Sequence, residues 1–284
     1  MVLEQIIQAR RLERNPSLIL AISFLFVSFA IILTNYFYPS DRGMVVLLLT
    51  IMPAIPFFLN FIRHEERRHE RENDDPHHSI FTIYRPLIAL YFFYFIGSAL
   101  SFGFWFSILP EQQANSMFAD VMQEYGLLRS SITGNFLSLN APVFMHILCQ
   151  NLLVLSLMMI FSFVYSIGSI FLLTWNAALL GVLIANTVRA LLPTVSQQFG
   201  IFAFPVAFIG GAGQALLGIM PHGIFEIGAF FVASLSGGIL SVALERGTYR
   251  RRAFWNIIYD AAKLFALSLV LVVLGAAIES LYAG

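Results

Sequence analysis

Charged residues are scarce in this sequence, and cysteine is almost absent. Only 11% of the 284 residues are Asp, Glu, Lys or Arg, whereas soluble proteins carry about 25%. The single cysteine, Cys149, excludes an internal disulfide, and a net charge of zero gives no indication of nucleic-acid binding. Hydrophobic residues make up 58% of the chain, with 29 phenylalanines. This composition predicts an all-α, polytopic helical membrane protein surrounded by membrane lipids.

Long apolar segments define the expected spans, which are residues 17–38, 44–62, 86–109, 143–165, 170–188, 221–244 and 260–282. A polar, charged loop at residues 63–85 divides the chain. We therefore expect an amphipathic segment and a two-span hairpin in residues 1–62, a charged cytoplasmic loop at 63–85, and a five-span core in residues 86–284. The long connection at 110–142 is predicted to hold an interfacial helix, because Met117, Val121 and Tyr125 recur every four residues.

The apolar segment 199–220 differs from an ordinary span because it contains Pro205 and the cluster Gly210, Gly211 and Gly213. Basic residues in short loops favour the cytoplasm. If this segment crossed the membrane fully, as an eighth span, the arginines of residues 246–252 would lie outside. We therefore prefer seven spans plus a re-entrant helical hairpin at 199–220 in the plasma membrane. The N-terminus is then cytoplasmic and the C-terminus lies outside.

The most unusual stretch is Pro221–His222–Gly223, followed by Glu226, in an otherwise apolar segment. Ionisable residues inside a membrane are costly and mark a candidate functional site. Pro221 suits the first turn of a helix. From His222 and Glu226 the same helical face continues through small residues at four-residue intervals, which allow close approach of another helix.

Histidine and glutamate one helical turn apart support several kinds of chemistry. They can hydrogen-bond and hold helices together, they can bind a metal such as zinc, or they can serve a proton-linked or substrate-binding role. For a metal site the third ligand is expected to be His146, with Glu279 as the other candidate. No established zinc-protease motif is present, so all three roles stay open.

Other polar residues lie within the expected spans. Gln150 and Asn151 are in the first turns of the fourth span, and Asn176 is inside the fifth. We expect these to be buried structural groups that form hydrogen bonds between helices.

The stretch from Pro221 to Ala229 resembles the Pro-His-Gly-x-x-Glu-x-x-Ala signature of the stage II sporulation protein M family. Asn151, the break at Gly168 and the segment 173–181 are similar to that family's preceding elements and occur in the same order. The similarity covers about residues 85–284. It implies a five-span core and a location in the cell envelope, and the family's members are not established enzymes.

Three functions follow from these observations. The first is a scaffold or subunit of a membrane complex in the cell envelope, with a buried His–Glu pair on the outer side and a homodimer or another membrane protein as partner. The second is an intramembrane metal-dependent hydrolase in which His222 and Glu226 are catalytic and His146 is a further ligand. The third is a transporter or channel whose re-entrant loop lines the path. The sequence leaves open whether the protein is an enzyme.

Overall fold

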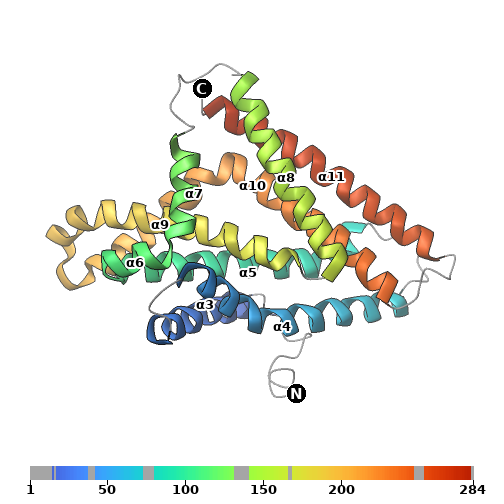
Figure 1. Cartoon of the computed structure of the whole chain (residues 1–284), viewed down its shortest axis with the longest axis horizontal. Coiled ribbons are helices and arrows are strands. Elements are labelled where there is room, and N and C mark those ends of the chain that lie inside the picture. Colours follow the sequence, from blue (N-terminus) through green and yellow to red (C-terminus); the bar gives the residue numbers. More distant parts are fainter. Residues whose placement is uncertain are drawn as a thin grey trace.

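The computed structural model describes residues 15, 17–37, 42–72, 80–130, 141–165, 168–245 and 253–282, and its regular elements there are all helices (Figure 1). Seven of these helices have 21 residues or more: α3 (Ser17–Phe37), α4 (Arg42–Glu72), α5 (Ile80–Ile108), α8 (Ala141–Tyr165), α9 (Ser169–Phe199), α10 (Ala203–Glu245) and α11 (Ala253–Tyr282). The prediction of an all-α fold is confirmed. The amphipathic segment expected before α3 lies outside the described residues.

The first part of the segment 63–85, which was expected as a charged loop, instead continues the helix of the second span, because α4 ends at Glu72. Opposite charges at helical spacing stabilise such an extension. The connection after α5 holds two short helices, α6 (Glu111–Met117) and α7 (Ala119–Ser130). Met117 and Val121 are buried there beside Phe102 and Phe106 of α5. The four-residue recurrence therefore marks the side of these helices that packs on the bundle.

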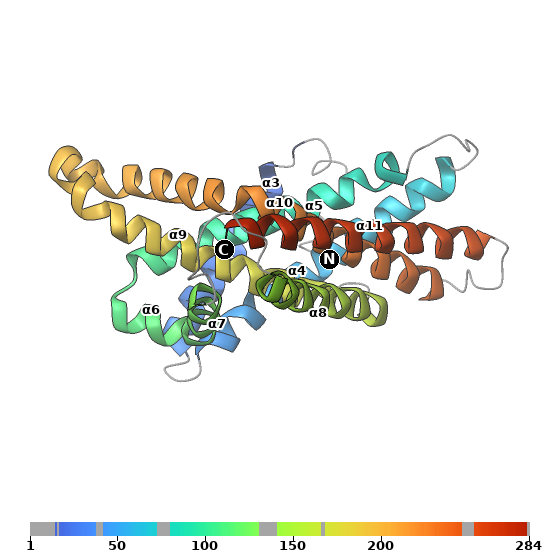
Figure 2. The ribbon, with the colours of Figure 1, turned by 90° about the horizontal axis from the view of Figure 1, so that it is seen from above.

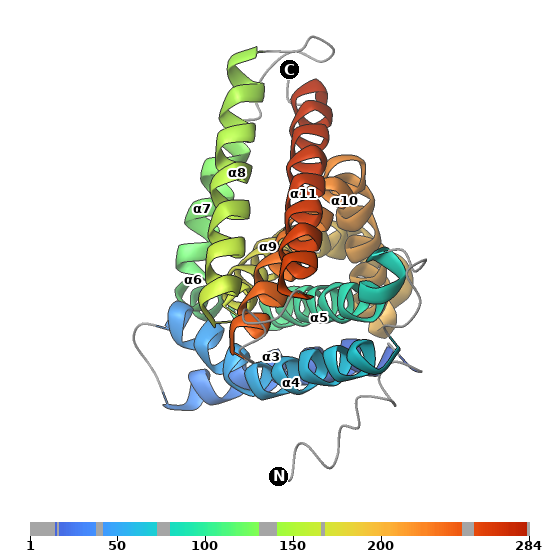
Figure 3. The same cartoon turned by 90° about the vertical axis from the view of Figure 1, so that its right-hand side faces the viewer.

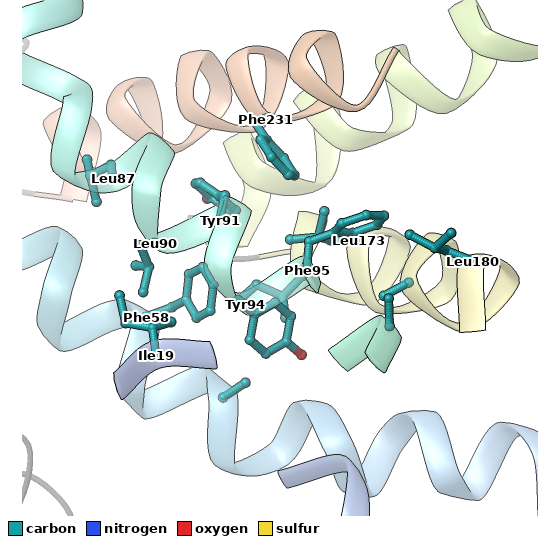
Figure 4. Close-up of a cluster of buried hydrophobic side chains, with 14 of the residues drawn as sticks. Ile19, Phe58, Leu87, Leu90, Tyr91, Tyr94, Phe95, Leu173, Leu180 and Phe231 are labelled. Atoms are coloured by element: carbon teal, nitrogen blue, oxygen red, sulfur yellow. The ribbon is translucent and has the colours of Figure 1, made fainter. Parts of the chain in front are cut away.

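Helix α5 supplies much of the core. Its residues Tyr91, Tyr94 and Phe95 point toward the surrounding helices in Figure 4 and are almost completely buried. The ring of Tyr91 stacks on Phe231 of α10 with a centroid distance of 6.1 Å. The Tyr94 hydroxyl shares a hydrogen bond of 2.8 Å with Thr174 of α9. Burial of these large rings accounts for much of the apolar stabilisation.

The N-terminal helix α3 packs directly on α5 through small and polar residues. A Cβ atom on Gly97 would lie 2.4 Å from the Leu20 carbonyl oxygen, so the two backbones are in close contact. Trp105 Nε1 donates to Ser28 Oγ at 2.9 Å, and Ser101 Oγ donates to the Phe24 carbonyl at 2.9 Å. These hydrogen bonds hold the N-terminal hairpin on the helices that follow it.

Residues 199–220 do not form a helical hairpin of their own, so the prediction of a hairpin within this segment is wrong. The chain reverses in the 3₁₀ turn η1 (Gly200–Phe202), where Gly200 has φ +51°, and α10 then runs unbroken to Glu245. Pro205 lies in the first turn of α10, where its missing N–H is not needed. Gly211 provides a close contact, since a Cβ atom there would lie 2.7 Å from Val188 Cγ2.

The result is a long hairpin formed by the end of α9 and the first half of α10. Figures 1 and 2 show its turn projecting beyond the other helices. Exposed apolar side chains lie at this tip, with Ile201 90% exposed. Figure 3 shows α8 and α11 rising side by side above the layer that contains α3, α4 and α5.

Candidate functional site

The candidate site lies where α10 changes its packing partners. Proline inside a helix removes one backbone hydrogen bond and bends the helix. Pro221 has this position in the middle of α10, and Figure 1 shows α10 changing direction near its middle. The expectation that Pro221 opens a helix is therefore wrong, because α10 begins at Ala203. Before the bend, Gly211 contacts Val188 of α9, whereas after it Gly237 contacts the α8 backbone.

Three side chains of residue types that can ligate a metal meet just after this bend. His222 and Glu226 come from consecutive turns of α10, and Glu279 comes from the last turn of α11. Each offers one ligand atom, and these three atoms lie within 4.8 Å of one another. All three residues are partly buried. Two carboxylates this close to each other repel unless their negative charge is reduced. An imidazolium, a proton shared between the carboxylates or a metal ion reduces it.

Two neighbouring residues hold Glu226 in position. Asn151 of α8 donates a hydrogen bond from Nδ2 to Glu226 Oε1 at 2.7 Å. On the α11 side, a Cβ atom on Gly275 would lie 2.6 Å from Glu226 Cγ, so this glycine leaves the space that the glutamate occupies. The site therefore joins α8, α10 and α11.

The other residues singled out in the sequence lie elsewhere or have a different environment. His146 is exposed on α8 and is not part of the cluster, so the expected third ligand is replaced by Glu279. Gln150 is exposed rather than buried. Asn176 donates to the carbonyl of Leu172 in its own helix at 2.8 Å, which is a bond within α9 and not between helices.

The small residues that follow Glu226 on α10 pack against protein. Ala229 and Ala233 are fully buried in a cluster with Leu155 of α8. A Cβ atom on Gly237 would lie 2.3 Å from the Met159 carbonyl oxygen. Gly223 is buried too, but a Cβ atom there would meet only Ile219 at 3.5 Å, so packing does not explain this glycine.

Sequence reasoning undervalued Glu279 and missed Gly275. A usable signal exists for both, because Gly275 and Glu279 are four residues apart and lie on one face of the last span. A carboxylate one turn beyond a glycine in an apolar helix indicates a close helix contact beside a polar group.

These features define a multi-pass helical membrane protein with a partly buried polar cluster between three of its helices. The described residues contain six helical stretches long and apolar enough to cross a membrane, and one of them, Ser169–Ser241, includes α9 and most of α10. The model of the family described as stage II sporulation protein M matches residues 89–283, and the chain belongs to this family. Comparison with curated proteins and with solved structures gave no match.

Proposed function

We propose that this protein is a scaffold or subunit of a membrane complex in the cell envelope and that it binds its partner through one face of α8. The supporting observation is an exposed polar face on an apolar helix. Within Ala141–Val164, only 17% of an apolar 18-residue segment is buried, against 61% of the corresponding segment within Arg85–Ile108 of α5. The exposed residues of α8 include His146, Cys149 and Gln150, which share one side of the helix. Polar groups facing lipid favour association with another helix.

The partner that fits this face is a second copy of the chain. The amide of Gln150 and the neutral imidazole of His146 each carry a hydrogen-bond donor and an acceptor. Such a surface is complementary to itself across a two-fold axis. The dimer would pair α8 with α8, and lipid would cover the apolar exposed helices.

The polar cluster has a structural part in this function. Asn151 is on the side of α8 that faces the bundle, and its 2.7 Å hydrogen bond to Glu226 fixes α8 against α10. Glu279 adds α11 to the same cluster. A helix held in this way presents its outer face to a partner without further ordering, which favours binding.

Disulfide crosslinking in native membranes tests the dimer, because Cys149 is the single cysteine. Mild oxidation should give a covalent dimer of the wild-type chain, and Gln150→Leu should reduce its yield. The matched control is Cys149→Ser combined with Val270→Cys, since Val270 is 56% exposed on α11. Equal crosslinking from both positions, or none from Cys149, would contradict α8 pairing. A Cys149 disulfide to a different membrane protein would replace the second copy by that partner.

The orientation in the plasma membrane follows from the arginine-rich segments. Between residues 63–72 and residues 246–252 lie the four long helices α5, α8, α9 and α10. An even number of crossings puts both segments on one side, and the positive-inside rule makes that side the cytoplasm. The N-terminus is then cytoplasmic, whereas the C-terminus and the α9–α10 turn are outside. The His–Glu cluster is on the outer side, because Glu279 is in the last turn of α11, at its outer end.

Labelling of intact cells tests this orientation in a chain that carries Cys149→Ser. A membrane-impermeant maleimide should label Gln198→Cys, which is exposed near the α9–α10 turn. It should label Arg250→Cys only after the membrane has been opened. Labelling of Arg250→Cys in intact cells would reverse the assignment.

A metal-dependent hydrolase is the second candidate, and the cluster of His222, Glu226 and Glu279 is the observation that favours it. A metal held by these residues would activate a water molecule. The transporter alternative used a re-entrant helical hairpin at residues 199–220 to line its path. Because α10 is one continuous helix from Ala203, no such hairpin supports it, and we do not propose it.

A further inference from the structure

We propose that His222, Glu226 and Glu279 bind one divalent transition-metal ion, with zinc as the best match. The inference concerns the cluster used in the proposed function, but it does not depend on whether α8 binds a partner. The ligand set combines one imidazole nitrogen with two carboxylate oxygens, and imidazole and carboxylate are both zinc ligands. Three protein ligands leave a fourth tetrahedral position for water or another oxygen ligand.

The geometry brings the three ligands to one point. Metal–ligand bonds of about 2.0–2.2 Å place tetrahedral ligand atoms about 3.3–3.6 Å apart. In the structure all three ligand atoms lie within 4.8 Å of one another. Binding would close that difference by rotation of the His222 and Glu279 side chains, since Asn151 and Gly275 hold Glu226 in position. Two are one turn apart on α10, and the third is from α11, which approaches Glu226 at Gly275.

The charge of the site calls for a cation. Glu226 and Glu279 are both partly buried in membrane-spanning helices. The salt bridge formed among the described residues pairs Lys263 with Asp260, and neither cluster carboxylate pairs with a lysine or an arginine there. Two carboxylates in such a setting are costly unless a proton, the imidazolium of His222 or a metal cation neutralises them. A divalent ion supplies that charge and contacts all three side chains at once.

A hydrogen bond from outside the ligand set supports the same assignment. Ligating carboxylates in metal sites are held by second hydrogen-bonding partners that fix their orientation. Asn151 has this relation to Glu226, because its Nδ2 donates to Oε1 at 2.7 Å. The other oxygen, Oε2, then remains for the metal. Asn151 is thus a positioning residue, and Glu226 is a ligand.

Metal analysis of the full-length protein tests the proposal. The protein is purified in detergent with an affinity tag that contains no histidine, stripped with a chelator, and titrated with Zn²⁺, Mn²⁺ or Co²⁺. We expect one tightly bound ion per chain, a rise in the unfolding temperature on binding, and the visible absorption of four-coordinate Co²⁺. Glu279→Gln and His222→Gln should each weaken binding at least tenfold. Asn151→Ala should weaken it about tenfold, as for other residues that position a ligand.

The matched control separates this site from other potential ligands. Asp260→Asn removes a carboxylate of α11 that pairs with Lys263 outside the cluster, and it should leave the metal affinity unchanged. The four histidines within residues 63–78 are further potential metal ligands. The difference in metal affinity between wild type and Glu279→Gln therefore decides whether the cluster is the binding site. A folded wild type that binds none of the ions, or a Glu279→Gln variant that binds as tightly as wild type, would overturn the proposal. Cys149 crosslinking is a separate readout, so the subunit role and the metal site can fail independently.

Discussion

The contact between α8 and α10 at Gly237 gives the sharpest stability prediction. A Cβ atom on Gly237 would lie 2.3 Å from the Met159 carbonyl oxygen and 2.9 Å from the Phe163 backbone nitrogen. Carbon–oxygen contacts in proteins are normally about 3.3–3.6 Å. Because backbone atoms of a helix cannot rotate away, Gly237→Ala must separate α8 from α10 by about 1 Å. Overpacking of this kind costs about 1–3 kcal/mol of unfolding free energy.

Alanine also has a higher helix propensity than glycine, which offsets about 1 kcal/mol of that cost. Gly228→Ala is the matched control, because it is on the same helix and a Cβ atom there has no neighbour within 4 Å. The propensity gain is common to both variants, so their difference reports the contact alone. We expect Gly237→Ala to be about 1–3 kcal/mol less stable than Gly228→Ala. Reversible unfolding in mixed micelles, followed by circular dichroism, measures this difference, and equal stability of the two variants would refute close packing of α8 on α10.

Three further substitutions test other contacts by the same unfolding measurement. Gly275→Ala should lower the free energy of unfolding by about 1–3 kcal/mol, because its new Cβ would lie 2.6 Å from Glu226 Cγ. In a Glu226→Ala background this loss should largely disappear, and a persistent loss would place the clash elsewhere. Arg189 Nη2 donates to the carbonyl of Phe106, near the end of α5, at 2.6 Å. Arg189→Ala removes this charged donor and should lower the free energy of unfolding by about 1.5–3 kcal/mol. Arg189→Lys should lower it less. Trp105→Phe should cost about 0.5–1.5 kcal/mol by removing the 2.9 Å hydrogen bond to Ser28, and no change would argue against this link between α3 and α5.

The sequence predicted most helices well because apolar length is a strong signal in a membrane protein. The first span was expected at residues 17–38, and α3 is Ser17–Phe37. The fourth was expected at 143–165, and α8 is Ala141–Tyr165. The expected end of the fifth span was wrong, since α9 continues past Pro193 to Phe199. A proline in a packed apolar helix removes one backbone hydrogen bond, and that loss is tolerated.

The site was only partly predictable for a different reason. The pairing of His222 with Glu226 follows from helical periodicity alone, and the structure places both in one helix. Which third residue joins them depends on the rotation of other helices, which periodicity does not specify. His146 and Asn151 are both in the first half of α8, yet only Asn151 reaches Glu226, whereas His146 is exposed. A difference of five residues in a helix changes the facing direction by about 140°.

The length of α10 explains why the polar cluster lies where it does. At 1.5 Å per residue, its 43 residues extend about 64 Å, roughly twice the 30 Å hydrocarbon core of a bilayer. A straight helix of this length would leave one half without a bundle to pack on. The bend at Pro221 resolves this, because the first half packs on α9 and the second half on α8 and α11. Pro221 leaves the carbonyl of Leu217 without its usual N–H partner. His222 and Glu226 follow on the next turns of α10. The proline and the polar pair are therefore parts of one arrangement, in which the bend directs α10 toward α8 and α11 and the pair meets Asn151 and Glu279 there.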